Sequence, residues 1–147
     1  MSEWVDLIWI AHLVSTWYMT GLIWFVQLVH YPLMNRVSPP NYIAFQQAHM
    51  NRTVWAVGPM MLLEAVTAAA LLFVRPEGFS MILAITGFIL VLALWISSAV
   101  FQVPCHLKLG KGFDAVPHRR LVRTNWIRTI AWSLRSALLA GVLGGVW

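Results

Sequence analysis

The sequence has little charge and a single cysteine. Only 10% of its 147 residues are charged, five of them acids, while 60% are hydrophobic and the mean hydropathy is +0.73. Soluble domains carry about 25% charged residues, and a chain this short cannot bury so much apolar surface in its own core. We therefore expect lipid to be part of its solvent. A single cysteine, Cys105, excludes an internal disulfide framework and a CxxC site.

Neither a signal peptide nor a nucleic-acid-binding surface is indicated. The first residues, MSEWVDLIWIAHL, carry acids where a signal peptide has Lys or Arg, and no small-residue cleavage site follows. We expect this first apolar run to be a retained span. The net charge of +5 is concentrated beside apolar runs, where membrane orientation explains it better than nucleic acid does.

Four apolar runs predict the fold, because a bilayer core requires about 20 apolar residues per helix. We expect helices at about 4–34, 40–74, 79–103 and 115–145. Tyr31-Pro32 and Ser38-Pro39-Pro40 are expected to break the first helix, and Pro104 to end the third. The sequence thus predicts one all-α domain, 1–147, that forms an integral membrane four-helix bundle with up-down-up-down order.

Lys and Arg are distributed unevenly between the two predicted membrane faces. One face holds seven of them: Arg36, Arg52, Lys108, Lys111, Arg119, Arg120 and Arg123. The other face holds Arg75 alone. Because cytoplasmic loops are rich in Lys and Arg, we expect a multi-pass protein of the bacterial inner (cytoplasmic) membrane. Its long loops would lie in the cytoplasm and both termini on the non-cytoplasmic side.

Each predicted helix carries one stripe of polar residues, and four stripes can converge only inside a bundle. Glu64 is the only acid well inside a span. Counting along the helices at about 1.5 Å per residue places Glu64 and Arg135 at similar depth. An unpaired charge there would be costly, so we predict a buried Glu64–Arg135 pair. The pair would either fix helix register or act in substrate or proton handling.

A second polar layer is expected nearer the cytoplasm. Three histidines from three helices share its depth: His30, His49 and His106. The other members are Gln27, Tyr31, Arg52, Gln102, Asn125 and Arg128. Each histidine alone is more often structural, but together the three favour a site. Imidazoles on facing helices suit a transition metal or the axial positions of a haem such as haem b.

The same layer offers an alternative ligand, a quinone or a phenolic ring. Tyr31 would serve as a proton or radical relay beside the histidines, which would be metal ligands or acid–base groups. Arg52, Asn125 and Arg128 would orient an anionic or carbonyl oxygen. Since the layer contains no carboxylate, a diiron-carboxylate site is not expected. His12, about five turns from His30, and His118, beside two arginines, are interpreted as a structural and a solvated residue.

Part of the chain resembles the anthrone-oxygenase-like family of small four-helix membrane proteins. The resemblance rests on Val103-Pro104 near the end of the third helix and on Asn125, Arg128 and Thr129 in the fourth. His30-Tyr31-Pro32 has a loose counterpart at the end of the family's first helix, whereas His106 stands where the family tends to have Asn. The chain is also similar to other small four-helix bacterial membrane proteins. These resemblances imply a four-helix fold and redox or oxygenase-like chemistry on aromatic substrates.

Two functions of different class follow. The first is a membrane-embedded oxidoreductase or oxygenase-like protein that holds a cofactor, an aromatic substrate or a quinone in the cytoplasmic half of the bundle. The second is a non-catalytic accessory subunit or assembly factor of a membrane complex, in which the polar residues pack helices. The expected partners are the lipid bilayer and a small molecule, with a complex partner or a second copy in a homodimer as further options.

Overall fold

A computed structural model describes residues 3–146, and within them it contains helices and turns but no strand. The elements, in order, are α1 (Glu3–Phe25), η1 (Val26–His30), α2 (Tyr31–Leu33), η2 (Met34–Arg36), α3 (Pro39–Ala70), α4 (Met81–Ser97), η3 (Ser98–Gln102), α5 (Val103–Leu109) and α6 (Ala115–Leu143). Elements α1 to η2 follow one another without a break, as do α4 to α5, so the nine elements form four long helices. The predicted all-α class is confirmed.

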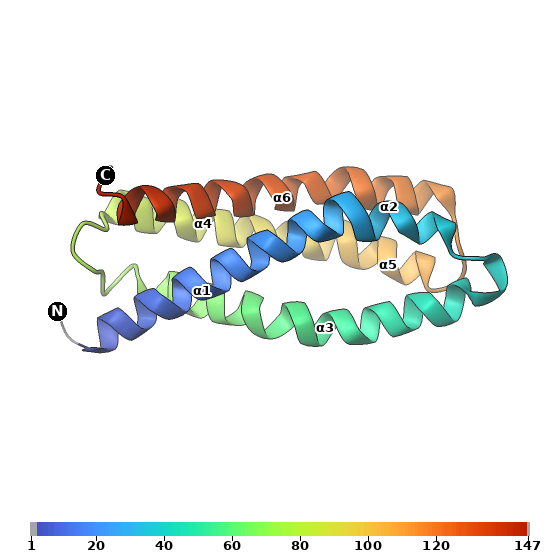
Figure 1. Cartoon of the computed structure of the whole chain (residues 1–147), viewed down its shortest axis with the longest axis horizontal. Coiled ribbons are helices and arrows are strands. Elements are labelled where there is room, and N and C mark those ends of the chain that lie inside the picture. The colour runs from blue at the N-terminus through green and yellow to red at the C-terminus, as the bar shows by residue number, and fades with distance from the viewer. Residues whose placement is uncertain (1–2, 147) are drawn as a thin grey trace.

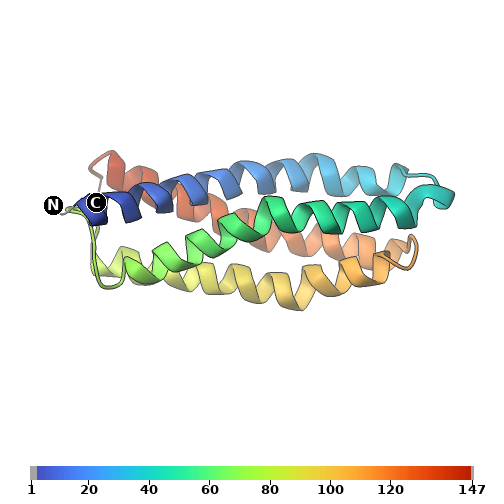
Figure 2. The ribbon, with the colours of Figure 1, turned by 90° about the horizontal axis from the view of Figure 1, so that it is seen from below.

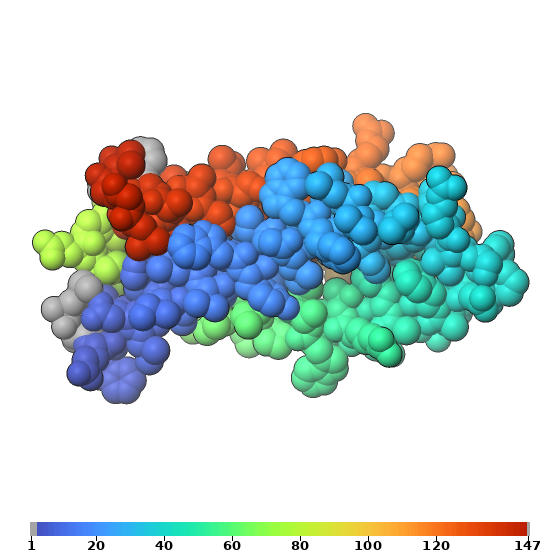
Figure 3. All heavy atoms as spheres, in the orientation of Figure 1, coloured from blue at the N-terminus to red at the C-terminus, as the bar shows by residue number. Residues whose placement is uncertain are grey.

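The four helices run along a common long direction (Figure 1). Both termini and the 71–80 connection lie at one end of the molecule, which we call the terminal end. The short connections around 37–38 and 110–114 lie at the opposite end, the loop end. Seen from below, α3 lies between α1 on one side and the α4–α5 helix on the other (Figure 2). The space-filling view shows α1 crossing between α6 and α3 and covering the interior on that face (Figure 3).

Three of the four helices are long and apolar enough to cross a bilayer: Glu3–Arg36, Pro39–Ala70 and Met81–Leu109. Large apolar side chains such as Trp55 and Ile82 are exposed on their outer surfaces, as lipid contact requires. Helix α6 is the exception, because it carries several arginines that lower its mean hydropathy. Its inward face is polar instead, with Asn125, Arg128 and Arg135 all buried.

Two helices continue through prolines that were expected to break or end them. In each, a five-residue π-helical turn is followed by one residue and then by the proline: η1 precedes Pro32, and η3 precedes Pro104. The N–H of Tyr31 bonds to Val26 O, and that of Val103 bonds to Ser98 O, each five residues back. Such a turn removes the α-helical register in which the proline ring would clash with a carbonyl group. The third helix therefore ends at Leu109 instead of 103.

Local side chains explain where the other helices begin and end. The α4 helix begins after Ser80, whose Oγ accepts a hydrogen bond from Leu83 N, and α6 begins after Asp114, whose carboxylate accepts one from Val116 N. The second helix was expected to reach residue 74, but α3 ends at Ala70 and residues 71–73 form turns. Pro76 follows closely, and the proline ring disfavours a helical backbone conformation in the residue before it. The helix therefore cannot easily continue to this point.

The predicted Glu64–Arg135 pair is present and lies at the centre of a network that joins all four helices. Arg135 Nε donates to Glu64 Oε1 at 3.0 Å, and both side chains are almost fully buried. The carboxylate also accepts hydrogen bonds from Thr16 Oγ1 at 2.8 Å and from Trp132 Nε1 at 2.9 Å. Arg135 also donates to Gly87 O on α4, which brings the remaining long helix into the network. The buried acid therefore has three donors, which offsets much of the cost of removing it from water.

His12 belongs to the same network, a partner that sequence reasoning did not assign. Its Nδ1 lies 2.8 Å from Thr67 Oγ1, and its Nε2 lies 3.2 Å from Arg135 Nη2. Thr67 donates its own hydroxyl proton to Leu63 O, so His12 Nδ1 donates to Thr67 and Nε2 accepts from Arg135. The interpretation of His12 as a structural residue therefore agrees with its contacts.

Breaking this pair should destabilise the bundle strongly. We expect Glu64→Gln or Arg135→Gln alone to cost about 3–5 kcal/mol, because each leaves its partner charged and buried. The double variant Glu64→Leu/Arg135→Met should recover most of that loss, since no unpaired charge remains. Thermal unfolding of the single and double variants in detergent micelles measures these changes in stability. Strictly additive effects of the single changes would contradict the central role of the pair.

Candidate functional site

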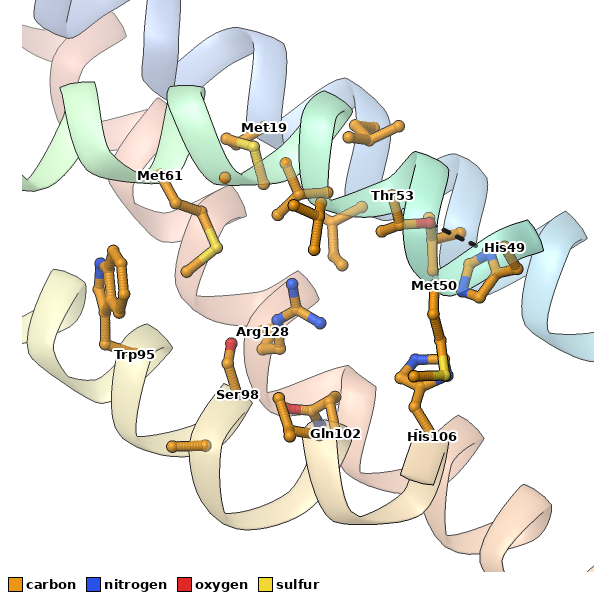
Figure 4. Close-up of a pocket in the computed structure, with 18 of the residues that line it drawn as sticks. Met19, His49, Met50, Thr53, Met61, Trp95, Ser98, Gln102, His106 and Arg128 are labelled. Atoms are coloured by element: carbon orange, nitrogen blue, oxygen red, sulfur yellow. Dashed lines mark hydrogen bonds between the residues drawn. The ribbon is translucent and has the colours of Figure 1, made fainter. Parts of the chain in front are cut away.

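A cavity of about 510 Å³ lies inside the bundle between α1, α3, the α4–η3–α5 helix and α6. Figure 4 shows Met61 and Trp95 at one end of it and His49 and His106 at the other, with Met19 contributed by α1. Most of the wall is apolar, and polar groups come from a few residues only: Tyr31, His49, Thr53, Trp95, Ser98, Gln102, His106 and Arg128. The volume and this mixture are typical of sites for small organic ligands.

Arg128 supplies the only charge in the cavity wall, and its guanidinium points into the middle of the cavity (Figure 4). The side chain is only 6% exposed. Its guanidinium donates from Nη1 to Asn125 Oδ1 at 3.3 Å and also lies beside the Tyr31 hydroxyl, and its buried Nε has no partner. The guanidinium also lies 5.2 Å from the centre of the Trp132 ring. Within residues 3–146 the only ion pair is Glu64–Arg135, so Arg128 has no carboxylate to balance its charge.

Asn125 bonds to Arg128, and Gln27 bonds to Asn125; neither Asn125 nor Gln27 lines the cavity. Asn125 Nδ2 donates to Gln27 Oε1 at 2.9 Å, which leaves Asn125 Oδ1 free to accept from Arg128. Gln27 in turn donates from Nε2 to Val122 O at 3.2 Å. The prediction that both residues contact a cofactor is not supported by this geometry. They position the arginine instead.

His30 and His49 form a stacked, hydrogen-bonded pair. His30 Nε2 lies 2.9 Å from His49 Nδ1, and the ring centres are 4.4 Å apart. Thr53 Oγ1 lies 3.1 Å from the same His49 nitrogen. Both contacts are made by His49 Nδ1, so the other ring nitrogen, Nε2, is left to bond to a ligand. His49 lines the cavity and His30 does not, so His30 acts on the site only through His49.

Tyr31 and His106 form a second hydrogen-bonded pair, and His106 also bonds to the buried side-chain amide of Gln46. Tyr31 Oη lies 3.0 Å from His106 Nε2, and Gln46 Nε2 lies 2.9 Å from His106 Nδ1. An amide nitrogen only donates, so with this amide orientation His106 Nδ1 accepts and its Nε2 donates to Tyr31. The Tyr31 hydroxyl proton is then free to bond a ligand oxygen in the cavity. Gln46 was missed in the sequence, where it belongs to a segment that looks interfacial.

The three histidines come together as predicted, but not as a metal site. In the described part of the chain, no group of three or more His, Cys, Asp or Glu side chains is arranged to hold a metal ion. Two imidazole nitrogens on one tetrahedral metal would lie about 3.3 Å apart, each with its lone pair on the metal, whereas His30 Nε2 and His49 Nδ1 lie 2.9 Å apart and bond to each other. The geometry thus favours an organic ligand over a metal coordinated by His30, His49 and His106.

Comparison with protein-family models, with curated proteins and with solved structures finds no match.

Two further predicted site groups lie outside the cavity. Arg52 shares the depth of the histidines, but its side chain is exposed on the outer face of α3 and does not line the cavity. Glu64 and Arg135 form their own network nearer the terminal end and do not line the cavity either.

Gln102 does line the cavity, as predicted from the sequence. Its amide nitrogen donates to Thr124 Oγ1 at 3.2 Å, and its amide oxygen accepts from Ser97 Oγ at 3.3 Å.

His118 is not solvated, contrary to expectation. It is buried, and its Nε2 lies 2.8 Å from the backbone oxygen of Tyr31. That carbonyl group belongs to the residue immediately before Pro32, next to the π-helical turn. His118 thereby ties the start of α6 to the end of the first helix and helps to fix the Tyr31 side chain.

The two buried arginines should respond oppositely to replacement by methionine. Arg128→Met removes an unbalanced buried charge, so we expect it to stabilise the empty protein by about 1–2 kcal/mol. Arg135→Met should destabilise it, because Glu64 loses its charged partner. Melting temperatures of the two variants in the same detergent provide the comparison. Equal destabilisation by both would show that Arg128 is a structural residue.

Proposed function

We propose that the chain is a membrane-embedded oxidoreductase or oxygenase-like protein that binds an aromatic, phenolic or quinone-type molecule in this cavity. The observation that carries the proposal is Arg128, a buried cation without a carboxylate partner that faces a mostly apolar cavity. A buried charge of this kind is costly unless a ligand pairs with it. A planar guanidinium is suited to an oxyanion or a carbonyl oxygen.

The neighbouring groups supply proton chemistry. In the tautomer in which Nδ1 of His49 carries the ring proton, its Nε2 can accept the proton of a phenol or of an acidic C–H beside a ketone, and Arg128 would stabilise the resulting phenolate or enolate. The free Tyr31 proton could bond the same oxygen. Methionines 19, 50 and 61 line the wall and adapt to rings of different shape.

The oxidant that fits an oxygenase-like reaction is dioxygen. An activated CH₂ group and O₂ would give a carbonyl group and water: the carbon is oxidised, one oxygen atom enters the product and the other leaves as water. The role of the chain would be to form and stabilise the carbanion that O₂ attacks. The resemblance of Val103-Pro104, Asn125, Arg128 and Thr129 to the anthrone-oxygenase-like pattern agrees with this chemistry.

A second candidate is a non-catalytic accessory subunit or assembly factor. It is favoured by the two histidine pairs, which bond mainly to other side chains of the bundle and could serve to join helices. The two candidates differ in what Arg128 requires. An enzyme needs an anionic ligand there, whereas an accessory subunit does not.

Binding of the fluorescent phenol 1-hydroxypyrene tests the proposal. We expect Arg128→Gln to weaken binding about 10- to 100-fold, since a hydrogen bond to a charged group contributes roughly 1.5–3 kcal/mol. Arg128→Lys should retain part of the affinity. Arg52→Gln is the matched control, because it removes the same charge from an exposed position. Equal affinity of the Arg128→Gln and Arg52→Gln variants would favour the accessory role.

We further propose that all four helices cross a bacterial inner membrane in up-down-up-down order, with the loop end in the cytoplasm. The excess of Lys and Arg near the loop end supports this orientation. The polar face of α6 is turned inward, so its outer face can contact lipid although its mean hydropathy is low.

Cysteine labelling checks this orientation. In a Cys105→Ser background, a membrane-impermeant maleimide should label Glu77→Cys in intact spheroplasts. It should label Lys111→Cys only after the membrane is permeabilised, because both positions are exposed but lie at opposite ends. The reverse pattern would place the loop end outside.

A further inference from the structure

The cavity reaches the surface of the bundle between α3 and the η3–α5 segment. Three residues that line it are also largely exposed: Val54 is 64% exposed, Val103 52% and Leu107 56%. Val54 lies on α3, and the other two lie on the opposite helix. All three are apolar, so the rim of this opening carries no charge.

This opening lies within two helices that are apolar enough to span a membrane, Pro39–Ala70 and Met81–Leu109. In the orientation proposed above, the part of the opening at Val54 and Val103 faces acyl chains, whereas exposed Lys108, next to Leu107, marks the headgroup level at its loop-end edge. An exposed apolar rim would be unfavourable in water but is matched to hydrocarbon. The cavity is therefore continuous with the hydrophobic layer of the bilayer.

The two ends of the bundle offer no comparable path. Toward the loop end, a buried cluster covers the histidines: Tyr31, Met34, Tyr42, Cys105, Leu109 and Leu121. Met34, Leu109 and Leu121 have no exposed surface. Toward the terminal end, the space beyond Met61 is filled by Leu94, Trp132 and the Glu64 network. Packing at both ends thus closes the cavity to water, and the side between α3 and η3–α5 is its open one.

We propose that the ligand enters from the bilayer through this lateral opening, and that it is a membrane-partitioned lipophile with one anionic or ionisable oxygen. The inference rests on the proposed function and narrows its substrate class. Along α3 the cavity wall extends from His49 to Met61, about 18 Å at about 1.5 Å per residue. A rigid body of several rings fits this length. Its oxygen lies on Arg128, and its apolar part points toward Met19, Met61 and Trp95.

The lateral path is tested by the rate at which 1-hydroxypyrene binds to the protein in lipid nanodiscs. Val103→Trp adds bulk at the rim, and we expect association at least fivefold slower than in the unmodified chain. Leu107→Ala widens the rim and should accelerate association. The matched control is Ile130→Trp, which places the same ring on an exposed part of α6 that does not line the cavity. Its rate should not change.

The outcomes separate this inference from the proposed function. If Arg128→Gln weakens equilibrium binding but neither rim variant changes the association rate, the site stands and the lateral path is wrong. If Arg128→Gln binds the probe as tightly as the unmodified chain, the proposed function itself fails. Unsubstituted pyrene tests the ligand class: it should bind at least tenfold more weakly than 1-hydroxypyrene. Equal binding would overturn the requirement for an oxygen.

Discussion

The carboxylate of Glu64 is the group on which the rest of the bundle depends. It is the one acid inside the bundle, and three donors from two other helices converge on it. Because this contact fixes the rotation of α6, it also decides where Arg128 points. Arg128 lies seven residues before Arg135, two turns away on the same face. Trp132 stands between them, with its N–H on Glu64 and its ring beside the Arg128 guanidinium.

The two buried arginines show how similar residues acquire different roles. Arg135 bonds to an acid, a backbone carbonyl group and a histidine, so its charge is neutralised and its N–H groups are hydrogen-bonded within the protein. Arg128 has an amide, an aromatic ring and the Tyr31 hydroxyl beside it, none of which carries a full negative charge. A fold that needed only stability would place an apolar residue there. On the proposed function, the unbalanced charge marks the position where stability is exchanged for ligand binding.

Much of this arrangement could be predicted from the sequence, and the failures have common causes. Depth is readable from residue counts, which is why the Glu64–Arg135 pair and the gathering of His30, His49 and His106 are present as expected. Direction around a helix axis is not readable with the same accuracy. Arg52 lies at the depth of the histidines, but its side chain is on the outer face of α3 and not on the face that lines the cavity. Nor could the sequence separate Asn125, which supports the site, from Arg128, which forms it, because that depends on side-chain contacts between helices.

The turns before Pro32 and Pro104 carry a consequence for how this chain is compared with others. A π-helical turn holds one residue more than the α-helical turn that it replaces, because its hydrogen bonds span five residues instead of four. A relative without the extra residue would superimpose on both sides of the turn while being one position shorter within it. An alignment that forbids gaps inside transmembrane helices would then shift every residue beyond η1 or η3 by one position. Equivalent histidines would be paired with the wrong neighbours, and proteins sharing this cavity would look unrelated.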